Sequence, residues 1–165
     1  MVDTISVTQT PLRQQLGNFS SIVCIKAILT GVEEALGEQA ATIALIAAGR
    51  QRGKSLAAEV NLTGKGTAIS LEEATQRVSQ ALGKDGTCLC LVDNILQSGE
   101  AYQVYVQETV ELAGESKGSS RTCTYTLGAI QGFLEAFLGQ RLRGKQVQSV
   151  LRGDIHDVLE YTILN

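Results

Sequence analysis

The sequence predicts an α+β fold: an antiparallel sheet of about four strands with helices packed on one face. Helix-like segments come first along the chain, followed by a hairpin, another helix and a second hairpin. The stretch AYQVYVQE alternates apolar and polar residues, as a half-buried strand does. TYTLGAIQGFLEAFL instead repeats apolar residues at helical spacing. The chain has 165 residues and is 44% hydrophobic, which is enough to bury one core.

Two regions are expected in the chain. Residues 1–18 are polar and should be loosely ordered, whereas residues 19–165 should form a single domain. The start of the chain lacks the basic and apolar regions of a signal peptide, and the longest apolar run, Ala40–Ala48, is too short to cross a membrane. We therefore expect no transmembrane segment and a cytoplasmic protein. The net charge of -3 argues against nucleic-acid binding.

The first helix should end at Leu36, before Gly37, and be capped by Asn18 or Ser20. Its apolar positions form a wide stripe, which predicts a mostly buried helix; they are Phe19, Ile22, Val23, Ile25, Ile28, Leu29, Val32 and Leu36.

A second helix is expected over 38–60. It carries Gly49 and Gly53 four residues apart, and a later helix over 122–138 carries Gly128 and Gly132 at the same spacing. Glycine in mid-helix costs roughly 1 kcal/mol relative to alanine. The pairs therefore suggest that something approaches the helix backbone closely, although a helix break near Gly49 is the simpler alternative.

The segments between these helices complete the prediction. Ser70 and Glu73 form a capping box that opens a helix over 71–83, with Ala74, Val78, Ala81 and Leu82 facing inward. Strands are expected over 87–93, 101–108, 146–152 and 157–164, with a turn over 94–100 and a loop over 109–120. Cys88 and Cys90 would share one face of the first strand.

No constellation of residues predicts catalysis. The four cysteines fit buried, reduced core positions better than a metal site or a disulfide framework. His156 lies in a turn without a nucleophile partner, and no nicotinamide, flavin or phosphate-loop motif is present. Arg50, Arg52 and Lys54 are basic residues that would receive a ligand carboxylate or phosphate, or simply solubilise the surface. We therefore predict no catalytic residues, metal or cofactor.

Three stretches carry a resemblance to a known family: AAGRQRGKSLAAEV (47–60), CTYTLGAIQGFLEAFLG (123–139) and QVQSVLRGDIHDVLEYTI (146–163). Together they resemble the 4-vinyl reductase, or hydrocarbon-binding, domain family. That family shares a fold superfamily with transport protein particle subunits and haem-nitric-oxide sensor domains. The cysteines that suggest a metal site in some members are replaced here by Ser149 and by the region of His156 and Asp157, and the family's glutamate by Gln146. Only Cys123 keeps its place.

The resemblance implies a non-catalytic domain that binds a small hydrophobic or tetrapyrrole-like molecule as a carrier, sensor or assembly factor. The expected ligand-binding residues are Tyr125, Ile130, Phe133, Leu134, Phe137, Gly128, Gly132, Gly49, Gly53, Arg50 and Cys123. Plain core packing is the alternative role for the aromatic face of helix 122–138. A homodimer is expected. The alternative function is a dimeric interaction or assembly protein with a vestigial pocket, as in photosystem or pigment–protein assembly, and a third is an enzyme of tetrapyrrole metabolism.

Overall fold

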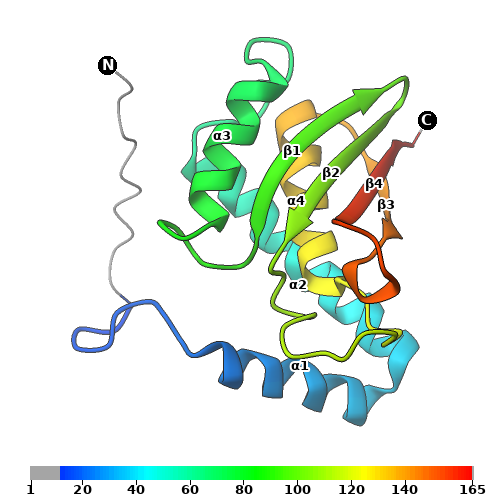
Figure 1. Ribbon diagram of the computed structural model, residues 1–165. Helices are drawn as coiled ribbons and strands as arrows, with labels where there is room; N and C mark the ends of the chain where they lie inside the picture. Colours follow the sequence, from blue (N-terminus) through cyan, green and yellow to red (C-terminus); the bar gives the residue numbers. More distant parts are fainter. Residues whose placement is uncertain (1–11, 165) are drawn as a thin grey trace.

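The computed structural model describes residues 12–164, so part of the segment expected to be loosely ordered, residues 1–11, lies outside the described residues (Figure 1). The elements are α1 (Ile22–Leu36), α2 (Glu38–Glu59), α3 (Leu71–Leu82), β1 (Leu91–Ser98), β2 (Ala101–Gln107), α4 (Thr124–Leu138), β3 (Leu142–Gln148), a 3-10 turn (Val150–Arg152) and β4 (Asp157–Ile163). None of the described helices is both long and apolar enough to cross a membrane.

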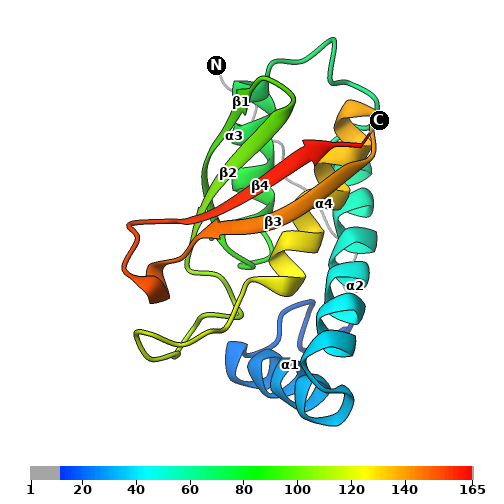
Figure 2. The same cartoon turned by 90° about the vertical axis from the view of Figure 1, so that its right-hand side faces the viewer.

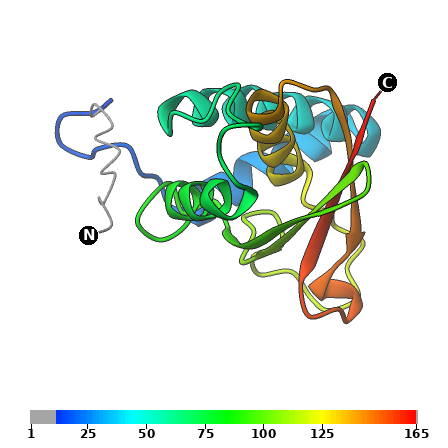
Figure 3. The same ribbon diagram turned by 90° about the horizontal axis from the view of Figure 1, so that it is seen from above.

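The four strands form one antiparallel sheet in the order β1-β2-β4-β3. Helix α4 lies between the sheet and α2, and α3 packs against β1 (Figure 3). The predicted α+β class is therefore confirmed. The alternation predicted for AYQVYVQE is also confirmed, because Tyr102, Val104 and Val106 on one face of β2 are all buried.

The first strand differs from the prediction in its position. β1 covers Leu91–Ser98, so most of the expected turn over 94–100 is strand, and only Gly99 and Glu100 connect it to β2. Its polar side chains are exposed at the edge of the sheet, which explains why the sequence looks like a turn. Cys88 lies outside the strand with a positive φ and is exposed, whereas Cys90 is buried. The two thiols therefore do not share a face.

The paired glycines form the contact between α2 and α4. A Cβ atom at Gly49 would lie 2.1 Å from the Tyr125 carbonyl oxygen, and one at Gly53 would lie 1.9 Å from that of Ala129. The reciprocal positions on α4 are equally tight, because a Cβ at Gly132 would lie 2.0 Å from the Arg50 carbonyl oxygen. The two helix backbones thus meet directly, which only glycine allows. The helix does not break at Gly49.

Because α2 covers one side of α4 and the sheet covers the other, α4 is buried on nearly every face. Two hydrogen bonds join it to the sheet inside the core. The Tyr161 hydroxyl of β4 donates to the Leu127 carbonyl oxygen (2.8 Å), and the Gln131 side-chain amide donates to the Leu142 carbonyl oxygen (2.8 Å). These bonds fix α4 against β3 and β4 and give the buried Tyr161 and Gln131 side chains hydrogen-bond partners.

The prediction that the first helix is mostly buried is wrong. In α1 only Leu29 is buried. The helix joins α2 at Gly37 and lies at one end of the molecule, away from the sheet (Figure 2). Its cap is Ser21, one residue beyond the predicted Ser20, whose hydroxyl accepts from the Val23 N–H (3.2 Å). The predicted cap of α3 is confirmed, since the Ser70 hydroxyl accepts from the Glu73 N–H (3.1 Å).

Substituting Gly49→Leu should lower the free energy of unfolding by about 3 kcal/mol or more, because the added side chain would displace the α4 backbone. Urea unfolding measures the loss. The neighbouring Ala48 is exposed on the same helix, so Ala48→Leu is a matched control that should stay within about 0.5 kcal/mol of wild type. Equal stability of the two variants would contradict the backbone contact.

Candidate functional site

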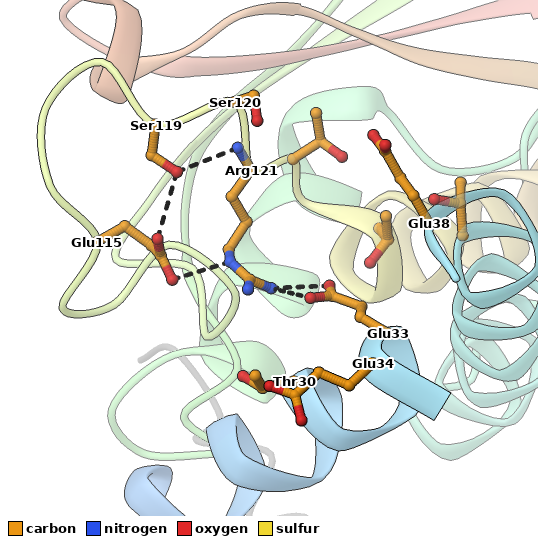
Figure 4. Close-up of a pocket in the computed structure, with 11 residues that line it drawn as sticks. Thr30, Glu33, Glu34, Glu38, Glu115, Ser119, Ser120 and Arg121 are labelled. Atoms are coloured by element: carbon orange, nitrogen blue, oxygen red, sulfur yellow. Dashed lines mark hydrogen bonds and ion pairs between the residues drawn. The ribbon is translucent and has the colours of Figure 1, made fainter. Parts of the chain in front are cut away.

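A pocket with a volume of about 400 Å³ opens between α1, the start of α2, the N-terminus of α4 and the loop before α4 (Figure 4). Its size falls within the range of small-molecule sites. The residues that line it are Thr30, Glu33, Glu34, Glu38, Thr42, Glu115, Ser119, Ser120, Arg121, Thr122 and Thr124. Hydroxyl and carboxylate groups therefore dominate, with one guanidinium.

Ion pairs hold the loop against α1. Arg121 lies 2.7 Å from a Glu33 oxygen and 2.8 Å from a Glu115 oxygen, and it points between the two carboxylates (Figure 4). Lys26 of α1 lies 2.6 Å from Glu115 and also donates to the carbonyl oxygens of Glu111 and Ala113. The hydrogen bond from Lys26 lowers the pKa of Glu115 below its ordinary value. Glu34 and Glu38, by contrast, are exposed.

The N-terminus of α4 is capped by a carboxylate from the loop. The Cys123 side chain makes no capping hydrogen bond. Instead the buried Glu111 carboxylate accepts from the Thr126 N–H (2.6 Å) and from the Thr126 hydroxyl (2.8 Å). Burial raises the pKa of Glu111, and the hydrogen bonds from Thr126 offset part of that rise. A negative charge is favourable at this end of a helix dipole.

One buried polar atom at this site has no partner. The Thr124 hydroxyl oxygen, in the first turn of α4, is the one buried side-chain nitrogen or oxygen within residues 12–164 that lacks a hydrogen bond. Thr124 also lines the pocket. A buried hydroxyl without a partner costs about 1–3 kcal/mol, so a water molecule or a polar ligand group that bonded to it would stabilise the protein.

The residues predicted to bind a ligand lie away from this lining. Ile130, Phe133, Leu134 and Phe137 belong to the main core, and the four glycines form the α2–α4 contact. Tyr125 packs beside Leu29 and Leu45 in a smaller cluster. Cys123 and Tyr125 flank Thr124 in the chain, so they come closest to the pocket. The polar run SSRTCT before an apolar helix was the available signal for the missed residues Arg121 and Thr124.

Two basic residues of α2, Arg50 and Arg52, are engaged in ion pairs. Arg50 forms a bidentate pair with Glu135 of α4 (2.6 and 2.9 Å), and Arg52 pairs with Glu59 (2.7 Å). Burial acts to raise the pKa of Glu135, but the hydrogen bonds from Arg50 and from the Leu142 N–H outweigh it and lower the pKa. Arg50 thus fastens α2 to α4.

Four residues that lie at or near the family's cysteine and glutamate positions meet in a hydrogen-bonded group: Cys123, Gln146, Ser149 and Asp157. The Gln146 side-chain oxygen accepts from the Cys123 N–H (3.0 Å), and its amide donates to Asp157 (3.0 Å). Burial raises the pKa of Asp157, while hydrogen bonds from the Val150 N–H and the Ser149 side chain lower it in part. Within residues 12–164, no three His, Cys, Asp or Glu residues are grouped to hold a metal ion.

Comparison with known proteins identifies the fold. No family model matches the chain, and neither does any curated protein sequence. Among solved structures, the phenol-responsive sensory domain of the transcription activator PoxR, determined with phenol, is similar with a TM-score of 0.66 and 12% identity, over 88% of this chain and 76% of that one. A trafficking protein particle complex subunit 3 from Naegleria fowleri, covalently bound to palmitic acid, has a TM-score of 0.48 and 13% identity, over 88% of this chain and 98% of that one.

Glu111 and Glu115 should give opposite pH dependences of stability. The folded protein holds the Glu111 proton more tightly than the unfolded chain, so the contribution of Glu111 to stability falls as the pH rises above its ordinary pKa of 4.5. Glu115 has a lowered pKa, so its contribution is lost as the pH falls below 4.5. The free energy of unfolding of Glu111→Gln, relative to that of wild type, should therefore increase as the pH rises from about 5 to about 8.

Glu115→Gln is the matched control, and relative to wild type it should gain stability only on acidification. Urea unfolding across the pH range measures both variants. If the stability of both variants relative to wild type changed with pH in the same direction, the opposite pKa shifts of Glu111 and Glu115 would be contradicted.

Proposed function

We propose that this chain is a non-catalytic binding domain for a small, neutral or cationic, largely hydrophobic molecule. The observation that carries the proposal is the unpartnered, buried Thr124 hydroxyl beside a pocket of about 400 Å³. A ligand with one hydroxyl, carbonyl or amine group would supply the missing hydrogen bond. The threonine methyl groups of Thr30, Thr42 and Thr122 offer apolar contacts for the rest of such a molecule.

The charges of the pocket restrict the ligand. Four glutamates line it against one arginine, and Arg121 already pairs with two of them. An anion would meet repulsion that no free cation at the site offsets. A neutral or cationic molecule is therefore favoured, and a tetrapyrrole with free carboxylates is disfavoured. The volume is at the lower end of the usual range of roughly 300–1,000 Å³, which favours one or two rings over a whole tetrapyrrole.

The fold supports this proposal. The chain has the architecture of a phenol-responsive sensory domain over most of its length, and a phenol is a small ring with one hydroxyl group. We infer that this chain has the same kind of role, as a sensor or carrier in the cytoplasm. We also infer that it belongs to the 4-vinyl reductase family, as the sequence motifs suggest. Since a fold hosts many functions, the pocket chemistry is the stronger support.

A second candidate function is a homodimeric interaction or assembly protein, of the kind that serves photosystem or pigment–protein assembly. The observation that favours it is α1, whose outward side is apolar and exposed. Large contiguous patches of exposed apolar surface mark interaction sites. The two candidates are compatible, because the pocket and the outward side of α1 are different surfaces.

Binding of phenol, benzylamine and protoporphyrin should be compared by calorimetry on the full chain. We expect the neutral or cationic rings to bind and the porphyrin diacid to bind more weakly. Native mass spectrometry of protein purified from its host would reveal a retained molecule. A protein that carries no extra mass and binds none of the three probes would leave the assembly role as the better proposal.

Thr124→Val is the diagnostic variant, because it removes the hydroxyl and keeps the shape. In the free protein it should raise the free energy of unfolding by about 1 kcal/mol, since a buried group without a partner is removed. It should weaken binding of the hydrogen-bonding ligand about 5–10-fold. Thr42→Val, at another lining residue, is the matched control, and it should not raise the free energy of unfolding. Loss of stability in Thr124→Val would mean that the hydroxyl is already bonded.

A further inference from the structure

The glutamates of the pocket differ in whether a cation neutralises them. Arg121 lies 2.7 Å from Glu33 and 2.8 Å from Glu115. Lys26 lies 2.6 Å from Glu115. Two cations thus meet two carboxylates, and the charges of this group cancel. The other two lining glutamates form no ion pair with any of residues 12–164: Glu34 and Glu38.

Glu34 lies at the end of a helix where a negative charge is unfavourable. It belongs to the last turn of α1, which contains no basic residue, and the C-terminal end of a helix dipole favours a cation. Glu38, by contrast, is the first residue of α2, where the helix dipole already favours a carboxylate. Of the two glutamates without an ion pair, Glu34 therefore gains more from a bound cation.

Thr30 places a hydrogen-bond acceptor beside Glu34. The two residues are four positions apart, so they lie one turn apart on the same face of α1, and both line the pocket (Figure 4). The Thr30 hydroxyl already donates its hydrogen to the Lys26 carbonyl oxygen (2.9 Å), so its oxygen can only accept a further bond. A carboxylate and an accepting hydroxyl together match an ammonium group, which only donates.

Thr124 offers a different kind of partner on another wall of the pocket. It lies in the first turn of α4, is 6% exposed, and its hydroxyl has no hydrogen bond within residues 12–164. A free hydroxyl can both donate and accept, and so can a hydroxyl group of a ligand. Because Thr124 and Glu34 come from different helices that line the same pocket, they would meet different ends of one molecule.

We propose that the ligand of this pocket is a small primary amine that carries a hydroxyl group at its other end. This inference deepens the proposed binding function and rests on it. The ammonium group binds Glu34 and Thr30, and the hydroxyl group binds Thr124. The apolar body of the molecule lies between these groups, against the methyl groups of the lining threonines. Glu34 is then the residue that makes the site prefer an amine to a neutral phenol.

The arrangement of the carboxylates favours an organic cation over a bare metal ion. Calcium takes about six to eight oxygen ligands, several of them from carboxylates. In the part of the chain that the structure describes, no three His, Cys, Asp or Glu residues are grouped to hold an ion. An ammonium group needs only one carboxylate and a neighbouring acceptor, which Glu34 and Thr30 supply.

Calorimetry on the full chain with probes of one skeleton tests the ligand class. Tyramine has both groups, phenethylamine lacks the hydroxyl, para-ethylphenol lacks the ammonium, and para-hydroxyphenylpropionate carries a carboxylate instead. Tyramine should bind about 10-fold more tightly than phenethylamine or para-ethylphenol, and the carboxylate should bind most weakly. If para-ethylphenol binds and tyramine binds no more tightly, the inference is overturned while the proposed function stands. If none of the four binds, the proposed function fails as well.

Glu34→Gln tests the position of the ammonium group, because it removes the charge and keeps the shape. It should weaken tyramine binding about 10-fold and change para-ethylphenol binding by less than about 2-fold. Glu38→Gln removes the same charge from the α2 wall and should weaken tyramine binding less. Glu72→Gln, at an exposed glutamate in the first turn of α3, is the matched control and should bind tyramine as the wild type does. Equal losses in Glu34→Gln and Glu38→Gln would overturn the assignment to Glu34.

Thr124→Val tests the other end of the ligand. It should weaken the binding of tyramine but not that of phenethylamine, which has no hydroxyl group to lose a partner. Equal weakening of both amines would overturn the contact between Thr124 and the ligand hydroxyl. Calcium binding that is lost in Glu34→Gln, in a protein that does not bind tyramine, would show a metal site instead and would also overturn the inference.

Discussion

The direct contact between the backbones of α2 and α4 determines the rest of this structure. Four glycines remove the side chains that would keep the helices apart, and the Arg50–Glu135 pair fastens them together. Because α2 occupies one side of α4 and the sheet occupies the other, the aromatic residues of α4 become core. The contact thus packs the four glycines against backbone, while the pocket lies where α1, the start of α2 and the N-terminus of α4 come together.

Two surfaces of different character lie where α1, the start of α2 and the N-terminus of α4 come together. The pocket is polar and mostly acidic, and it holds a buried hydroxyl without a partner. The outward side of α1 is apolar and almost free of charge. The same helix separates them, because Lys26 and Glu33 on its inner side form the ion pairs that hold the loop beside the pocket. A ligand that displaced Arg121 would therefore act on the helix that presents the apolar side.

The sequence predicts most of the helices and strands, whereas no pattern in it marks the pocket, and both outcomes have physical reasons. Alternation in residues 101–107, the spacing within α4 and the cap at Ser70 are local signals, and the structure follows them. The burial of α1 could not be read from its apolar stripe, since the same stripe fits a core or a partner. The glycine pairs do indicate a close approach, but only the fold reveals that the approaching group is another helix. The pocket assembles residues from α1, α2, α4 and a loop, so no spacing in the sequence marks it.

We propose that a small molecule binds at the N-terminal end of α4 and not between α4 and the sheet. Amide chemical shifts, followed by nuclear magnetic resonance during a titration with phenol, test this most directly. The account predicts that the largest changes occur in residues 30–42 and 115–124, around Arg121 and Thr124. Changes centred on Phe133, Phe137 and Tyr161, with residues 115–124 unaffected, would contradict it and would place the ligand in the core.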